Sequence, residues 1–215
     1  MSESEQARSD LASIEREIEG SRQATARLLA TLESAKDLDA SRDSQLSGWT
    51  IGHVLTHIAR NADSFVWILR SAAQDLKVPQ YPGGPAQRSR DIDEGATRPA
   101  AAIVEDVRES ACRLDETFSA VGPDAWHRHW LRPDGSEVPG RLLPVARWRE
   151  VEVHHADLGL GYRTSDWPEA FVSADLPNAL ERLPGMIDDP TQRAALLAWI
   201  YGRAGIPAGV DLKPF

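Results

Sequence analysis

The feature that most constrains the fold is a run of apolar residues with helical spacing that begins just after Thr50. The apolar positions are Ile51, Val54, Leu55, Ile58, Ala62, Phe65, Val66 and Leu69. This spacing places them on one broad face of an α-helix, and threonine is a favourable residue before the first helical turn. We therefore predict a helix that begins at Thr50, fades near Asp75 and buries a wide face against other elements.

Three further segments show the same periodicity. They run from about Glu5 to Ser34, from Thr97 to about Val121, and from near Gly140 to Gly159 or Gly161. Pro99 and Pro144 fall in the first turns of the last two, where proline is tolerated. Four amphipathic helices within about 160 residues indicate a helical bundle.

The connecting segments differ in character. Residues 78–95 are rich in proline, glycine and charge, which predicts a long loop of the kind that often carries function. The residues RPDG between Trp130 and Val138 predict a small hairpin or tight turn. Beyond Tyr162, prolines divide the chain into short pieces, with one further helix expected from Thr191 to Arg203. We expect a bundle over residues 1–162 and a small appendage over residues 163–215.

Composition excludes several classes of protein. The net charge of -9 and the pI of about 5.2 offer no general attraction for nucleic acid or an anionic membrane, although a few local arginines could still bind a small anion. No stretch approaches the ~18 apolar residues of a transmembrane helix. The N-terminus is polar and unlike a signal peptide, and the single cysteine, Cys112, cannot form an internal disulfide. We therefore expect a cytoplasmic protein in which Cys112 is a buried, inert thiol.

Two pairs of side chains have the spacing of metal ligands. His53 and His57 lie four residues apart in the second predicted helix, and Glu150 and His154 lie four apart in the fourth. Residues with this spacing share a helix face, so two facing helices could supply a three-ligand site that stays open to water or substrate. Imidazole and carboxylate ligands suit zinc, and also iron or nickel. Spacing alone does not choose between His53 and His57, and solvated pairs are the alternative interpretation.

The residues around His154 support the metal interpretation. Val151 and Leu158 place His154 on the stripe that should be buried, and a glutamate buried nearby needs a partner such as a metal ion. His155 and Asp157 could orient a ligand imidazole or lie at the surface. The remaining histidines, His127 and His129, fall in a turn region and should be exposed.

Two segments resemble a known family. They are GWTIGHVLTHIARNAD, over residues 48–63, and WREVEVHHADLG, over residues 148–159. Together they resemble the mycothiol-dependent maleylpyruvate isomerase family, within the DinB-like superfamily of metal-binding four-helix bundles. Tyr81, Arg88 and Ile92 also lie in familiar positions. The resemblance covers residues 1–162 and implies a mainly α fold, a DinB-like bundle with an α or α/β appendage that is shorter than the family's usual C-terminal subdomain.

The resemblance implies a ligand set and cofactors. Zinc would be held by His57, Glu150 and His154, and mycothiol would be the thiol cofactor. Arg203, in AWIYGRAG, matches a family arginine thought to serve the substrate, and Arg88 is a second candidate for the substrate carboxylates. Neither the residues that bind the thiol nor the oligomeric state is indicated.

The implied reaction is the cis–trans isomerisation of maleylpyruvate, a dicarboxylate, to fumarylpyruvate in gentisate-type degradation of aromatic compounds. A thiolate adds to the double bond, the adduct rotates, and elimination restores the double bond. The absence of a plausible nucleophilic cysteine in the chain agrees with a borrowed thiol. Two alternatives remain open, namely another mycothiol-dependent S-transferase and a non-catalytic protein that binds a metal or ligand.

Overall fold

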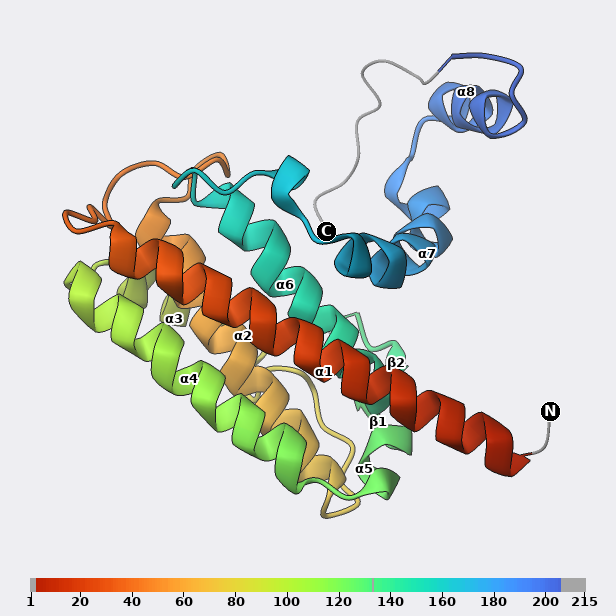
Figure 1. Cartoon of the computed structure of the whole chain (residues 1–215), viewed down its shortest axis with the longest axis horizontal. Helices are drawn as coiled ribbons and strands as arrows, with labels where there is room; N and C mark the ends of the chain where they lie inside the picture. Colours follow the sequence, from red (N-terminus) through yellow and green to blue (C-terminus); the bar gives the residue numbers. More distant parts are fainter. Residues whose placement is uncertain (1–2, 133, 206–215) are drawn as a thin grey trace. The chain divides into compact units, whose positions relative to one another are not determined.

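The computed structural model describes residues 3–132 and 134–205, and these residues are mainly helical (Figure 1). The chain divides into two compact units, Met1–Phe171 and Val172–Phe215. Four long helices form the first unit: α1 (Glu3–Ser34), α2 (Ile51–Ala72), α4 (Ala100–Ala120) and α6 (Leu143–Asp157). The four helices predicted from periodicity are confirmed. The boundary expected after residue 162 stays a prediction about domain organisation.

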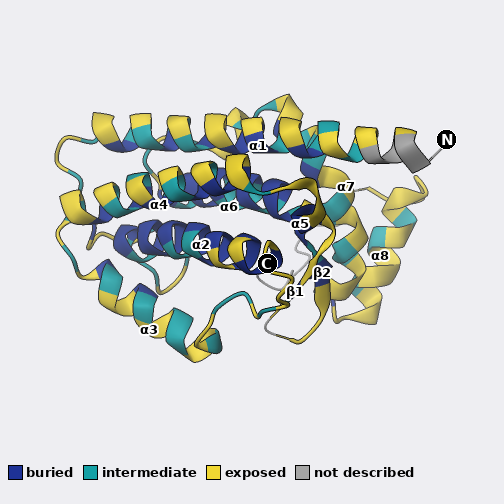
Figure 2. Ribbon diagram, turned by 90° about the horizontal axis from the view of Figure 1, so that it is seen from below, coloured by how far each residue is buried: buried dark blue, intermediate teal, exposed yellow. Residues whose placement is uncertain are grey.

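Helix α2 is the most deeply buried element of the bundle (Figure 2). The Thr50 side chain accepts a hydrogen bond from the backbone N–H of His53 and caps the first turn, as its residue type predicts. Helix α2 packs mainly against α4, and α1 packs mainly against α6. The core between them contains Ile14, Ile18, Phe65, Leu69, Leu114 and Phe118.

The prediction of a long loop over residues 78–95 is wrong for the second half of this segment, because residues Gly84–Ala96 form helix α3. This helix has little apolar periodicity, since it buries only Ile92 and Ala96. It crosses α2 closely: a Cβ atom on Gly52 would lie 2.5 Å from the carbonyl oxygen of Ala96. Glycine is therefore needed at this crossing, which holds α3 beside the first half of α2.

The hairpin predicted around RPDG is confirmed. Strands β1 (His129–Leu131) and β2 (Glu137–Pro139) are antiparallel, with Trp130 opposite Val138. The short helix α5 (Pro123–His127) precedes β1, and the 3-10 turn η1 (Gly140–Leu142) leads into α6. His127 and His129 are exposed, as predicted.

Cys112 is exposed, so the expectation of a buried thiol is wrong. It lies on α4, and the buried side of that helix is instead occupied by Val107, Leu114 and Phe118. The helical period allowed a residue beside Ala111 to face either way, and the packing of α4 on α2 decides that Cys112 faces outward.

The C-terminal residues are more helical than their prolines suggest. The 3-10 turn η2 (Thr164–Asp166) is followed by α7 (Glu169–Met186) and α8 (Pro190–Ile200). The expected helix near 191–203 is confirmed by α8, whereas α7 continues through Pro177 and Pro184. A proline inside a helix removes one backbone hydrogen bond and its ring crowds the carbonyl of the preceding turn, which is why the sequence predicted shorter pieces here. Within 163–205 the structure describes helices and turns but no strand, and no described helix is long and apolar enough to cross a membrane.

Candidate metal centre

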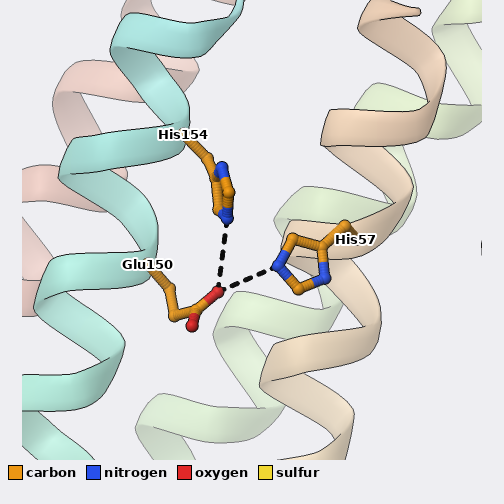
Figure 3. A group of neighbouring side chains, drawn as sticks. All are labelled: His57, Glu150 and His154. Carbon is orange, nitrogen blue, oxygen red and sulfur yellow. Dashed lines mark hydrogen bonds and ion pairs between the residues drawn. The ribbon is translucent and has the colours of Figure 1, made fainter. Parts of the chain in front are cut away.

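Two helices of the bundle bring His57, Glu150 and His154 together (Figure 3). His57 lies in α2, and the other two lie one turn apart on α6. The Oε2 atom of Glu150 is 2.9 Å from His57 Nε2 and 3.6 Å from His154 Nε2. All three candidate ligand atoms lie within 4.8 Å of one another. In the described part of the chain, this is the one group of three or more side chains that could hold a metal ion.

The arrangement fits a divalent ion of the zinc type. Ligand bonds of ~2.0–2.2 Å in a tetrahedral site separate neighbouring ligand atoms by roughly 3.3–3.6 Å. The observed separations bracket this range, so small side-chain movements would complete the geometry. Three protein ligands leave one position open, as in catalytic rather than structural zinc sites.

His53 makes different contacts from those of His57. Its Nδ1 accepts a hydrogen bond from the backbone N–H of Thr50 at 3.2 Å, and its Nε2 lies 3.8 Å from Asp93 Oδ1. His53 thus takes part in capping α2, one turn before His57. The geometry supports the choice of His57 as the ligand from this helix.

Neighbouring side chains orient both imidazoles. Asp157 Oδ2 lies 2.8 Å from His154 Nδ1, so Nδ1 keeps its hydrogen and donates it to the carboxylate, which leaves Nε2 for a metal. Arg88 Nη2 donates to His57 Nδ1 at 3.0 Å, so the hydrogen of neutral His57 lies on Nε2 and is donated to Glu150. His155 has another role, because its Nε2 lies 2.9 Å from Thr31 Oγ1 on α1.

The charges of the three residues depend on one another. Burial lowers the pKa of His57. Burial alone would raise the pKa of Glu150, but its hydrogen bonds with His154 and His57 hold it well below its ordinary value. Burial alone would lower the pKa of His154, yet Asp157 and Glu150 raise it to about 9. Without a metal, protonated His154 therefore supplies the positive charge that balances Glu150 at neutral pH.

This arrangement predicts a pH-dependent stability of the metal-free chain. The pKa of His154 rises on folding from 6.5 to about 9. Protonated His154 therefore contributes fully to the free energy of unfolding below pH 6.5, and this contribution is lost as the pH rises to about 9. The contribution is at most about 3 kcal/mol. We expect urea unfolding of chelator-treated protein to show this loss, and the variant His154→Gln to lack it. An equal loss in the variant would contradict the assignment, and bound zinc should reverse the trend because its ligands must be deprotonated.

Aromatic side chains border the centre. The ring of Trp49 meets that of His57 edge-on, with centroids 5.6 Å apart, and the Arg88 guanidinium lies 5.6 Å from the centroid of the Tyr81 ring. Burial raises the pKa of Tyr81, so its hydroxyl stays protonated. The sequence interpretation did not assign Trp49 to the site. Its position directly before the N-cap of the helix that carries His57 is the signal that could have identified it.

Arg88 and Arg203 have different surroundings. Arg88 lies on α3 in direct contact with His57. Arg203 belongs to the second unit, where its side chain is exposed and its backbone N–H donates to Ala198 O at 2.7 Å. A role for Arg203 in binding substrate stays a prediction.

Comparisons with known proteins agree with the motifs. Residues 21–159 match the family model described as the mycothiol maleylpyruvate isomerase N-terminal domain. A crystal structure of the mycothiol-dependent maleylpyruvate isomerase is similar, with a TM-score of 0.72, 23% sequence identity and coverage of 94% of this chain and 95% of that chain. A crystal structure of a histidine-to-alanine mutant of the mycothiol-dependent maleylpyruvate isomerase is also similar. Its TM-score is 0.76 at 21% sequence identity, and the match covers 94% of this chain and 97% of that chain. The chain has no significant match among curated protein sequences.

At these identities, the two solved structures show the fold. Because nearly all of each is covered, they give no support to the expectation of a shortened C-terminal part. The fold is the helical bundle of the mycothiol-dependent maleylpyruvate isomerases, as the resemblance of the two segments implied.

Proposed function

The chain belongs to the mycothiol maleylpyruvate isomerase family, and on that premise we propose that it converts maleylpyruvate to fumarylpyruvate with mycothiol as cofactor. The observation that carries the proposal is the convergence of His57, Glu150 and His154 from two helices. Two imidazoles and one carboxylate form a site that suits zinc and retains an open position. A thiol-dependent enzyme of this kind needs such a position.

The reaction requires temporary loss of a double bond. Maleylpyruvate is a dianion with a cis carbon–carbon double bond, and rotation is possible only while that bond is single. Zinc, when bound, would supply a coordination position that lowers the pKa of the thiol of mycothiol. The protein's own residues hold the ligands in place: Asp157 orients the His154 ring, and His57 and His154 keep Glu150 ionised.

Arg88 is placed to bind a substrate carboxylate. In the metal-free arrangement it donates to His57 Nδ1. An imidazole that binds metal through Nε2 carries its hydrogen on Nδ1, so Arg88 loses this acceptor once the metal is bound. Its planar guanidinium is then available for a carboxylate, which it can bind through two hydrogen bonds. The same positive charge would stabilise negative charge that develops on the substrate.

The test is an assay of the full chain with zinc and mycothiol, in which loss of maleylpyruvate and formation of fumarylpyruvate are both followed. We expect isomerisation that depends on the thiol. Arg88→Met should lower kcat/KM by about 10–100-fold, which is the effect expected for loss of one charge-assisted hydrogen bond to the substrate. The variant should retain its zinc. Arg90→Met is the matched control, because Arg90 is exposed on the same helix and bonds Gln87.

Other outcomes have distinct meanings. A product that retains the thiol would replace the isomerase proposal with an S-transferase. Bound zinc without any thiol-dependent reaction would indicate a binding protein. The proposed partners are a small dicarboxylate and a low-molecular-weight thiol, rather than nucleic acid or a membrane. A cytoplasmic location agrees with the single cysteine, because disulfides are rare in that compartment.

A further inference from the structure

The two helices that carry the candidate metal ligands are not each other's main packing partners. Helix α2 packs mainly against α4, and α6 packs mainly against α1. His57 must nevertheless meet Glu150 and His154 across the interface between α2 and α6. Metal–ligand distances tolerate deviations of only about 0.2 Å. Side chains that join α2 directly to α6 therefore decide whether the three ligands can reach one ion.

Arg147 makes such a connection. It lies on α6, three residues before Glu150, so the two residues share a face of this helix. Its Nη1 atom donates to the carbonyl oxygen of Ile58 and to Asn61 Oδ1, both at 2.8 Å. Ile58 directly follows His57 in α2, and Asn61 lies about one turn beyond His57. The guanidinium thus holds α6 to α2 within one turn of a ligand on each helix.

This connection is deeply buried. Arg147 and Asn61 are each only 1% exposed, so bulk water does not compete for their hydrogen bond. Burial lowers the pKa of Arg147 to about 10, and the negative charge of Glu150 acts against this decrease. The guanidinium therefore remains charged at neutral pH. Its hydrogen bonds to α2 are of the strong, charge-assisted kind.

The cost of burying Arg147 argues against a role in stability alone. Both acceptors of Nη1 are neutral, and the buried Nη2 has no hydrogen-bond partner among the described residues. A buried charge with incomplete partners is unfavourable, and an apolar side chain of similar volume often stabilises a core at least as well. The best-attested use of such a group is to fix the register of packed helices.

We propose that Arg147 is a positioning residue of the metal centre, which fixes the register of α6 against α2 so that Glu150 and His154 meet His57. It acts through the two helices rather than as a ligand. The inference rests on the metal centre of the proposed function but on no particular reaction. Replacement of the isomerase proposal by another metal-dependent activity would therefore not affect it.

The test measures the zinc affinity of the full chain by competition with a chromogenic chelator, after circular dichroism has shown that each variant is folded. We expect Arg147→Met to raise the dissociation constant for zinc by about 10–100-fold, the effect of losing a residue that orients metal ligands. Asn61→Leu removes one acceptor and keeps the cation, so it should raise the constant by about tenfold. If Arg147→Met does not fold, Asn61→Leu decides.

Glu152→Ala is the matched control, because Glu152 is also fully buried on α6 but bonds Arg27 on α1. This variant should unfold more readily than the wild type and still bind zinc with unchanged affinity. The comparison separates a positioning role from a general loss of stability.

Cobalt(II) in place of zinc gives a second readout, because its visible absorption depends on the coordination geometry. The absorption should weaken in the Arg147 and Asn61 variants, as water replaces a protein ligand. Wild-type zinc affinity and an unchanged cobalt spectrum in the folded variants, or an equal loss of affinity in Glu152→Ala, would overturn the proposal. A wild-type chain that binds no zinc would overturn the metal centre together with it.

Discussion

Replacing Glu150 by alanine is expected to leave the purified chain without metal and without isomerase activity. Glu150 is the only carboxylate among the three candidate ligands, and its Oε2 contacts both imidazoles. Among the candidate ligands, the variant retains two imidazoles and no carboxylate to bind a divalent ion directly. Loss of a residue that only orients a ligand weakens metal binding by about 10–100-fold, so loss of the ligand itself should exceed this. Elemental analysis and competition with a chelator measure the change.

The comparison needs a variant that alters charge but not the site. Glu109→Ala serves this purpose, because Glu109 is exposed on α4 and its ion pair with Arg113 is long, at 3.9 Å. This control should retain one metal ion per chain and full activity. A full complement of metal in Glu150→Ala, with an unchanged dissociation constant, would rule out the proposed ligand set.

Replacing Glu152 by alanine is expected to lower the free energy of unfolding by about 3–5 kcal/mol, the range for removing one partner of a buried ion pair. Glu152 is fully buried, two residues from Glu150 on α6. Its carboxylate accepts hydrogen bonds from Arg27 on α1, from Trp148 Nε1 at 3.2 Å and from Tyr162 OH at 2.5 Å. Without it, three donors that join α1, α6 and the segment after α6 lose their acceptor.

Urea unfolding followed by circular dichroism measures this loss, which corresponds to a fall in Tm of roughly 10 °C for a protein of this size. Glu152→Gln keeps an acceptor oxygen and should lose less. Glu109→Ala again serves as the control and should change stability by about 0.5 kcal/mol or less. Metal content should persist in folded Glu152→Ala, since Glu152 contacts none of the candidate ligands. A loss below about 1 kcal/mol would show that this network does not stabilise the bundle.

Much of the fold follows from local sequence. The apolar period after Thr50 predicted α2 and its capped start, and similar periods predicted α1, α4 and α6, because helix formation depends on residues three and four positions apart. The same relation predicted that Glu150 and His154 share a face. Helix α3 was not predicted, because it buries only two residues and therefore lacks an apolar period.

Three features depended on how the helices pack. The rotation of α2 against α6 decides that His57 meets Glu150 while His53 contacts the start of its own helix. Glu150 and Glu152 lie two residues apart and so face different sides of α6, but only the packing decides that Glu150 meets α2 and Glu152 meets α1. In the sequence, nothing distinguishes Arg147 from an ordinary charged residue. Only the tertiary structure shows that its side chain is buried and that its Nη2 has no hydrogen-bond partner among the described residues.

The sequence by itself therefore determined the four long helices of the bundle, the helix face that Glu150 and His154 share, and the family, since each depends on residues close together or on recognisable segments. The tertiary structure alone decided which side chains face one another across the bundle, which are buried and which remain without a partner. These properties depend on the relative rotation and separation of helices distant in sequence, and side-chain spacing within a single helix carries no information about either.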